Sequence, residues 1–251
     1  MRAADVLERR ATRGSRPGYA VARAVGGSLA ALLIAGSAVS LVPTTLEQQA
    51  SEVGSLPERI TGLVVHSPRG DVVVTEIADG SPQTPSVQLA TAWTLNEPQL
   101  TVEDDDGRVT LGTRCPGLNF GRCEADLELS VPAGIPVRVV TNLGDIHVSS
   151  TGVVDARADL GDVQVRGRPT SVTASSDLGD VTLDVAAAPD DVTVTTSLGD
   201  VRVVLPGGEG YAVDATTDLG DRSVQVPSDP AAPHTVTVRS SLGNVEVVPR
   251  G

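Results

Sequence analysis

Aspartates recur at a regular interval along the second half of the chain and are the first candidates for chemistry. A stacked column of carboxylates could bind Ca²⁺, which prefers oxygen ligands. The alternative is turn capping, in which each carboxylate accepts backbone amide protons. Because the glycine-rich nonapeptide of calcium-binding β-rolls is absent, we favour capping and expect no metal or cofactor. The five aspartates follow Leu-Gly at intervals of 17 to 21 residues: Asp145, Asp162, Asp180, Asp200 and Asp221.

The few cysteines and histidines leave little material for catalysis. Cys115 and Cys123 bracket a short glycine-containing loop, and outside the cytoplasm such a pair predicts a disulfide. His66 and His147 fall at outward positions of expected strands, and His234 lies in a proline-rich stretch. No arrangement typical of a nucleophilic triad is present, so we assign no catalytic residue and expect no enzymatic activity.

Composition excludes several binding modes. Aromatic residues are 2% of the 251 residues, too few for a sugar-binding platform of stacked rings. All 19 basic residues are Arg. Residues 43–251 carry 13 Arg against 30 Asp and Glu, a net charge of −17. Such a surface repels phosphate backbones, so we expect no nucleic-acid partner.

A repeat centred on Leu-Gly-Asp or Leu-Gly-Asn positions these aspartates. Val precedes every Leu by six residues, and a small residue precedes it by two. The alternation continues after the turn, so each unit is predicted to be strand, tight turn, strand, with one buried face and the Leu closing the first strand inward. Arg222 occupies an inward apolar position, which predicts a local distortion. The turns contain Leu143, Gly144, Leu160, Gly161, Leu178, Gly179, Leu198, Gly199, Leu219, Gly220, Leu242 and Gly243.

Two all-β architectures fit these units. In a β-solenoid, each unit is one coil and equivalent residues stack in parallel. In an antiparallel β-meander, Gly-Asp would be the two-residue turn of a hairpin. The turn never changes length, whereas the connections between units vary from Gly167-Arg168-Pro169 to residues 227–233. Near-identical residues in every unit favour the solenoid.

Residues 59–130 form a less regular β region. Residues 63–74 resemble a degenerate unit in which Arg69 replaces the turn Leu. The resulting Arg-Gly-Asp is explained by its alignment with the repeat rather than by cell attachment. Residues 87–95 and 126–131 are predicted strands, and residues 100–111 a hairpin.

The N-terminal segment has the pattern of a membrane anchor. Residues 24–42 are uncharged and, as a helix, about 28 Å long, which matches a hydrocarbon core. Residues 1–23 carry six Arg against Asp5 and Glu8, which places this end in the cytoplasm. A cleaved signal peptide, with Ala38 and Ser40 before the cut, is the alternative.

The Leu-Gly-Asp-Val units and the Val-Pro-Ala-Gly segment at residues 131–134 resemble the bacterial "putative adhesin" β-strand-repeat family, a domain of unknown function. The resemblance covers roughly residues 60–251 and implies an envelope location and a solenoid-like fold. It supplies no catalytic residues. Members typically have Ser where this chain has the turn Leu.

The sequence therefore predicts a single-pass cell-membrane protein whose C-terminal domain is extracytoplasmic. Its predicted role is a non-catalytic, adhesin-like module that binds an envelope polymer or protein. The alternative is a structural or sensory ectodomain in envelope-stress signalling. The predicted organisation is a cytoplasmic tail (1–23), a transmembrane helix (24–42), a linker (43–58), an N-terminal β region with the disulfide loop (59–130) and the β-repeat solenoid (131–251).

Overall fold

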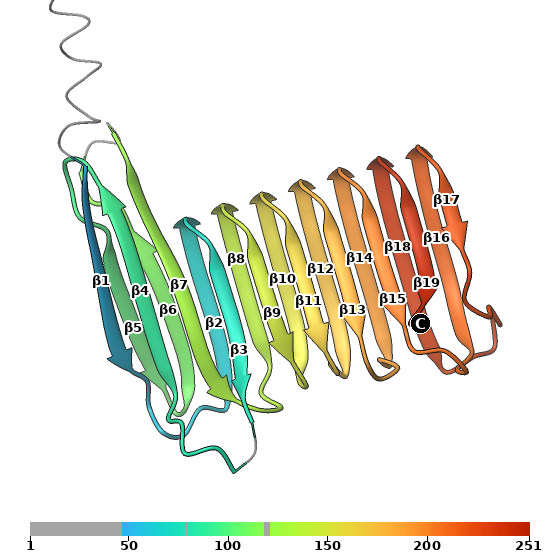
Figure 1. The fold of residues 1–251 in the computed structure, drawn as a ribbon, viewed down its shortest axis with the longest axis horizontal. Coiled ribbons are helices and arrows are strands. Elements are labelled where there is room, and N and C mark those ends of the chain that lie inside the picture. Colours follow the sequence, from blue (N-terminus) through green and yellow to red (C-terminus); the bar gives the residue numbers. More distant parts are fainter. Residues whose placement is uncertain (1–46, 79, 118–120) are drawn as a thin grey trace, which may run out of the picture. The chain divides into compact units, whose positions relative to one another are not determined.

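The computed structural model describes residues 47–78, 80–117 and 121–251, which contain 19 β-strands (Figure 1). The all-β prediction is confirmed for these residues. The predicted transmembrane helix and cytoplasmic tail lie outside them. No helix long and apolar enough to cross a membrane occurs in the described part of the chain.

The strands form two sheets. Sheet A has ten strands in the order β1 (Gln48–Ser55), β4 (Ser86–Trp93), β7 (Cys123–Pro132), β3 (Val72–Ile77), β9 (Ile146–Ser150), β11 (Val163–Gly167), β13 (Val181–Val185), β15 (Val201–Leu205), β19 (Val245–Pro249) and β17 (Arg222–Val224). Sheet B has nine strands in the order β16 (Tyr211–Leu219), β18 (His234–Leu242), β14 (Asp191–Leu198), β12 (Ser171–Leu178), β10 (Val153–Leu160), β8 (Val137–Leu143), β2 (Gly62–Arg69), β6 (Arg108–Arg114) and β5 (Gln99–Asp105).

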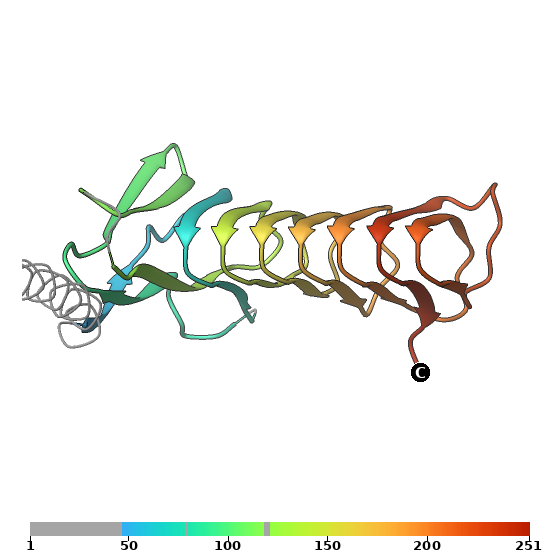
Figure 2. The same cartoon turned by 90° about the horizontal axis from the view of Figure 1, so that it is seen from above.

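Each repeat unit contributes one strand to each sheet. The strand before a Leu-Gly-Asp turn lies in sheet B and the strand after it in sheet A, so the two sheets face each other and are joined along one edge by the turns (Figure 2). Equivalent strands of different units pair in parallel, with Val154 opposite both Val137 and Val172. The antiparallel meander is therefore wrong for these units, because the strands that flank a turn do not pair with each other.

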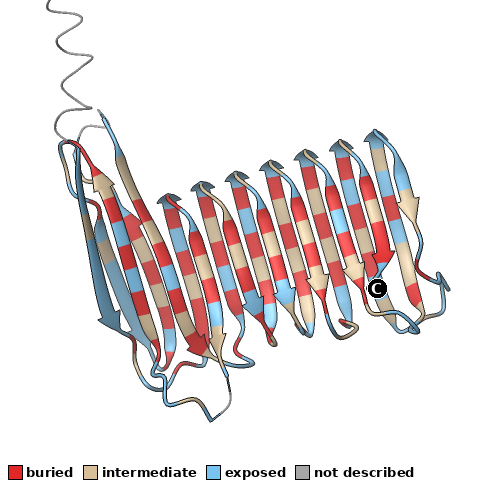
Figure 3. Ribbon diagram, in the orientation of Figure 1, coloured by how far each residue is buried: buried red, intermediate tan, exposed pale blue. Residues whose placement is uncertain are grey.

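The core lies between the sheets and is built by the predicted alternation (Figure 3). Val172 and Val192 before the turn, and Val181 and Val201 after it, are at most 1% exposed. Burying each such side chain contributes about 1.5–3 kcal/mol. The stack therefore gains its stability from one column of aliphatic side chains per position, and the small number of aromatic residues is no obstacle.

The last two units are interchanged relative to the chain. β18 and β19 lie between the unit of β14 and β15 and the unit of β16 and β17. The end of the stack is thus formed by β16 and β17, and the last unit in the sequence is flanked on both sides. All units share one hydrogen-bonding register, with Leu242 opposite both Leu198 and Leu219.

Arg222 is explained by this interchange. It begins β17 opposite Val245, in register with the apolar residues of the other units, and its side chain is exposed. The predicted distortion is not seen at this pairing, because the position lies on the terminal unit, where a guanidinium reaches solvent. Its Nε donates to the carbonyl of Ala215 at 2.7 Å.

The N-terminal strands continue the stack. β2 and β3 pair in parallel with β8 and β9, so residues 59–130 and 131–251 share one core rather than forming separate layers. β4 pairs antiparallel with β7, and β5 and β6 form the predicted hairpin. Residues 43–58, expected as a linker, contain β1, which pairs antiparallel with β4. Because β1 is an exposed edge strand held by backbone hydrogen bonds, it has no apolar alternation for sequence analysis to detect.

Candidate functional site

The glycines of the Leu-Gly-Asp turns bring neighbouring units into close backbone contact. The turn glycines have φ between 141° and 152°, which side-chain-bearing residues rarely adopt. A Cβ on Gly179 would lie 2.1 Å from the carbonyl oxygen of Gly161 in the adjacent unit. The same clash recurs at every turn of the stack, so glycine is required by the spacing of the units.

The turn aspartates form a continuous hydrogen-bonded ladder. In each pair of adjacent units, one oxygen of the side chain accepts the backbone amide of the equivalent residue in the next unit. Asp145 accepts from Asp162 at 2.8 Å, and Asp162 accepts from Asp180 at 2.8 Å. The ladder runs through Asp126, Asp71, Asp145, Asp162, Asp180, Asp200, Asn244 and Asp221.

This ladder gives the metal candidates a structural role. Each side chain caps a backbone amide of the next unit rather than an amide of its own turn. Asn244 fills the same role, because only an acceptor oxygen is needed. In the described residues, no group of three or more His, Cys, Asp and Glu side chains is arranged as a metal site requires. The aspartates are brought together along one edge, each already bonded to its neighbour's backbone, except Asp221 at the end of the stack.

A second ladder was not foreseen. The small residue two positions before each Leu carries a hydroxyl in five of the six units, and this hydroxyl donates to the carbonyl of a turn glycine. Ser176 donates to Gly161 at 2.8 Å, and Thr196 donates to Gly179 at 3.0 Å. The recurrence of Ser and Thr at a buried position was the signal that could have revealed it, since a buried hydroxyl needs a partner.

The one unit without this hydroxyl provides a test. Ala158 has no hydroxyl to donate to the Gly144 carbonyl of the adjacent unit. Thr141, which lies in the same unit as Gly144, donates to this carbonyl instead at 3.1 Å. We expect Thr141→Val to lower the free energy of unfolding by about 1–3 kcal/mol, because the half-buried Gly144 carbonyl loses the hydroxyl of a fully buried side chain. In an Ala158→Ser background the new hydroxyl takes over, and the cost should fall to less than half. Urea unfolding of the four proteins measures this; an equal cost in both backgrounds contradicts the assignment.

The turn leucines point outward, and the prediction that they close the first strand inward is wrong. Leu143 is 40% exposed and Leu219 is 66% exposed, with the other four between these values. The cause is the turn itself. Asn142 and Leu143, the two residues before Gly144, are both exposed, so the period-2 alternation ends at Thr141. The result is a row of six exposed leucines in register beside the aspartate ladder.

Asp126 begins the aspartate ladder and has an unusual charge environment. Burial raises the pKa of its carboxyl, although the hydrogen bond from the Asp71 amide opposes the shift and nearby Glu124 adds to it. A carboxyl with a raised folded-state pKa binds protons more tightly than in the unfolded chain, so its contribution to stability is lost as pH rises through the folded pKa.

Asp126→Asn should therefore remove the loss of stability that accompanies deprotonation of this carboxyl. The amide oxygen keeps the acceptor, as Asn244 does. We expect the variant to be at least as stable as the parent at pH 7, with a smaller decrease in stability between the acidic range and pH 7. Urea unfolding across this pH range is the measurement, and a variant less stable than the parent at pH 7 contradicts the expectation.

The three histidines do not come together. His66 is exposed on β2, and His147 is half-buried on the outer face of β9 beside Gln164 and Arg166, which line a 340 Å³ groove with it. His234 is not in a loop but begins β18, where its Nδ1 lies 2.9 Å from the carbonyl of Pro189. No common site is formed by these side chains.

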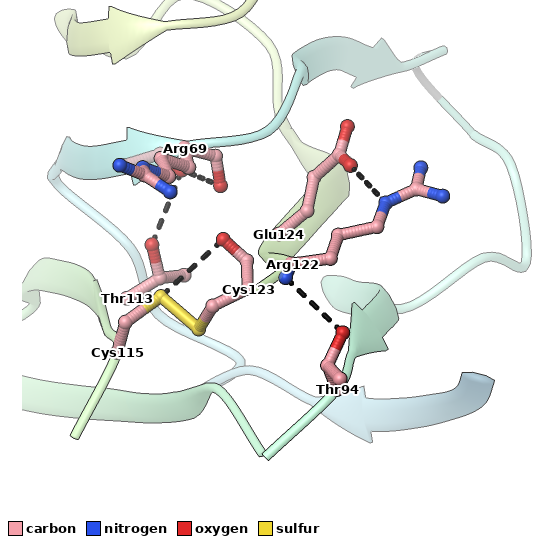
Figure 4. The surroundings of a disulfide bond; sticks show 8 residues. Arg69, Thr94, Thr113, Cys115, Arg122, Cys123 and Glu124 are labelled. Carbon is pink, nitrogen blue, oxygen red and sulfur yellow. Dashed lines mark hydrogen bonds and ion pairs between the residues drawn. A yellow bond between two sulfur atoms is a disulfide. The ribbon is translucent and has the colours of Figure 1, made fainter. Parts of the chain in front are cut away.

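The two cysteines are joined in a disulfide near the start of β7 (Figure 4). Their Cα atoms are 6.1 Å apart. The adjacent Arg122 donates its backbone amide to Thr94 at 3.2 Å, and its guanidinium pairs with Glu124 at 2.8 Å. The disulfide thus lies where the loop after β6 returns to sheet A.

Comparisons with known proteins identify the fold. A structure from Clostridium sporogenes, named "putative cell adhesion protein", superposes with a TM-score of 0.51 at 13% identity, covering 81% of this chain and 100% of that one. A "putative adhesin" from Bacteroides fragilis is 14% identical, covers 80% and 97%, and has a TM-score of 0.34. No curated protein matches the sequence. The model of the Toastrack DUF4097 family matches residues 58–248, and the chain belongs to this family.

Proposed function

We propose that this protein is a membrane-anchored, extracytoplasmic β-solenoid that binds a partner at the cell surface and has no catalytic activity. The observation that carries the proposal is the stack itself, which places equivalent outward positions in register along two sheets and repeats an exposed Leu at every Leu-Gly-Asp turn. Such extended, repeated surfaces are typical of binding proteins. The adhesion-related name of the Clostridium sporogenes structure supports the same role.

The membrane anchor is supported by the sequence of the N-terminal segment. Residues 24–42 are apolar and long enough to span a bilayer, and the preceding arginines favour a cytoplasmic N-terminus. The disulfide between Cys115 and Cys123 is consistent with an oxidising compartment for the β domain.

Topology gives a direct prediction. A reporter that is active only in the cytoplasm, fused after Gly251, should give no signal, whereas the same reporter fused before Met1 should be active. The reason is the arginine-rich segment before residue 24, which the positive-inside rule keeps in the cytoplasm. Activity of the C-terminal fusion measured in intact cells would overturn the proposed location.

Binding is tested with the full chain in lipid nanodiscs, labelled with a fluorophore and mixed with fractions of the cell's own envelope. Saturable retention on one fraction, abolished by unlabelled protein and by prior unfolding in urea, is the expected result. Retention that never saturates, or none on any fraction, contradicts a surface-binding function.

A further inference from the structure

The outward leucines are the part of the repeat that the fold does not explain. The turn glycine is required by the contact between units, the aspartate by the amide ladder and the small hydroxyl by the glycine carbonyl. The leucines instead remain 40–66% exposed, although six of them stand in adjacent units. A contiguous apolar row on a soluble surface is typical of an interaction site.

The geometry of this surface is regular. We call it the turn edge, defined by Leu143, Leu160, Leu178, Leu198, Leu242 and Leu219 in stack order. Neighbouring strands are about 4.8 Å apart, so the six leucines extend about 24 Å. Arg69 takes the equivalent place opposite Leu143 and ends the row on the N-terminal side.

Negative charge flanks the leucines on both sides. Asp159, Asp177 and Asp218 precede their leucines by one residue and are exposed, and the ladder aspartates follow by two. None of these carboxylates belongs to an ion pair between described residues. The turn edge is thus an apolar strip between two rows of uncompensated carboxylates.

We propose that the turn edge binds a cationic amphipathic α-helix of a partner protein. An α-helix of 18 residues is about 27 Å long and presents apolar residues about every 5.4 Å, close to the repeat of the leucines. Arg or Lys beside its apolar stripe would face the two rows of aspartates. A second copy of this chain is disfavoured because two acidic edges would be brought together, and an anionic lipid surface is disfavoured by the same repulsion.

This inference rests on the proposed surface-binding function and adds its location and partner chemistry. The test uses the full chain in nanodiscs and an 18-residue helical peptide of Leu and Lys with all leucines on one face. The comparison peptide has the same composition in a scrambled order without an apolar face. Binding is measured by fluorescence anisotropy at two salt concentrations.

Three variants separate the contributions. Leu160→Ser, Leu178→Ser and Leu198→Ser together should weaken peptide binding more than about tenfold, since the apolar strip is lost. Asp159→Asn with Asp177→Asn, whose side chains make no hydrogen bond to other described residues, should weaken it about fivefold and reduce its salt dependence. Val153→Ser removes an equally exposed side chain (49%) from the opposite end of β10 and should leave binding unchanged.

The outcomes that overturn the inference are distinct. Equal binding of the scrambled peptide, or full binding by the leucine variant, removes the turn edge as a helix site. Self-association or binding to vesicles of neutral lipid that disappears in the leucine variant assigns the strip to a second copy or to a membrane instead. If the leucine variant fails to fold by circular dichroism, the aspartate variant decides. Saturable envelope binding that survives in the leucine variant retains the proposed function but places it elsewhere on the stack.

Discussion

Replacing Gly199 with alanine is expected to lower the free energy of unfolding by about 3–5 kcal/mol. Two costs combine. Gly199 has a φ of 151°, and a Cβ there would lie 2.1 Å from the carbonyl oxygen of Gly179, which is backbone and cannot swing away. The adjacent units would have to separate, which also stretches the bond from the Asp200 amide to Asp180.

The matched control is Gly207→Ala. Gly207 lies in the connection between β15 and β16, where a Cβ would meet no atom within 4 Å. We expect a change of less than about 1 kcal/mol there. Urea unfolding followed by circular dichroism compares the two variants. Similar stability of both would show that the close approach of the units is not essential.

Insertions should also destabilise the protein by different amounts at the two edges of the stack. One residue inserted between Leu198 and Gly199 should destabilise the protein by several kcal/mol, because it shifts β15 by one residue and turns the buried Val201 and Val203 outward. It also removes Gly199 from the glycine column and Asp200 from the amide ladder.

Inserting Gly-Ser between Gly207 and Gly208 should cost less than about 1 kcal/mol, since closure of an exposed loop depends only weakly on its length. Both glycines are exposed, and the insertion spares the bond from the Tyr211 hydroxyl to the Pro206 carbonyl. Urea melts measure both variants. Equal destabilisation would contradict the division into a fixed turn edge and a variable opposite edge.

Sequence analysis succeeded where a local pattern alone determines whether a residue is buried or whether a turn has a fixed length. Alternation identified the buried valines, and the constant turn length indicated that the turn, not the connection, is under constraint. It failed for the leucines because the alternation ends at Thr141, and only the backbone path of the turn determines which way the next residues point.

The order of the last two units was also beyond the sequence. Both units have Val six residues before the Leu and a hydroxyl two before it, so either would fit beside β14. The difference lies in the unit that must end the stack, where Arg222 is tolerated because it is exposed. The edge strand β1 was missed because it is exposed and pairs with β4 through its own backbone, which leaves no apolar pattern in its sequence.

The interchange of the last two units limits how such a protein can lengthen during evolution. β18 and β19 are hydrogen-bonded on both sides, so a unit added after them in the chain could not pair with either strand. Duplication within residues 143–205 instead adds a step between units that are consecutive both in the chain and in space. Gene-level gain or loss of repeats is therefore expected in the middle of the stack, while the two C-terminal units are inherited as a pair.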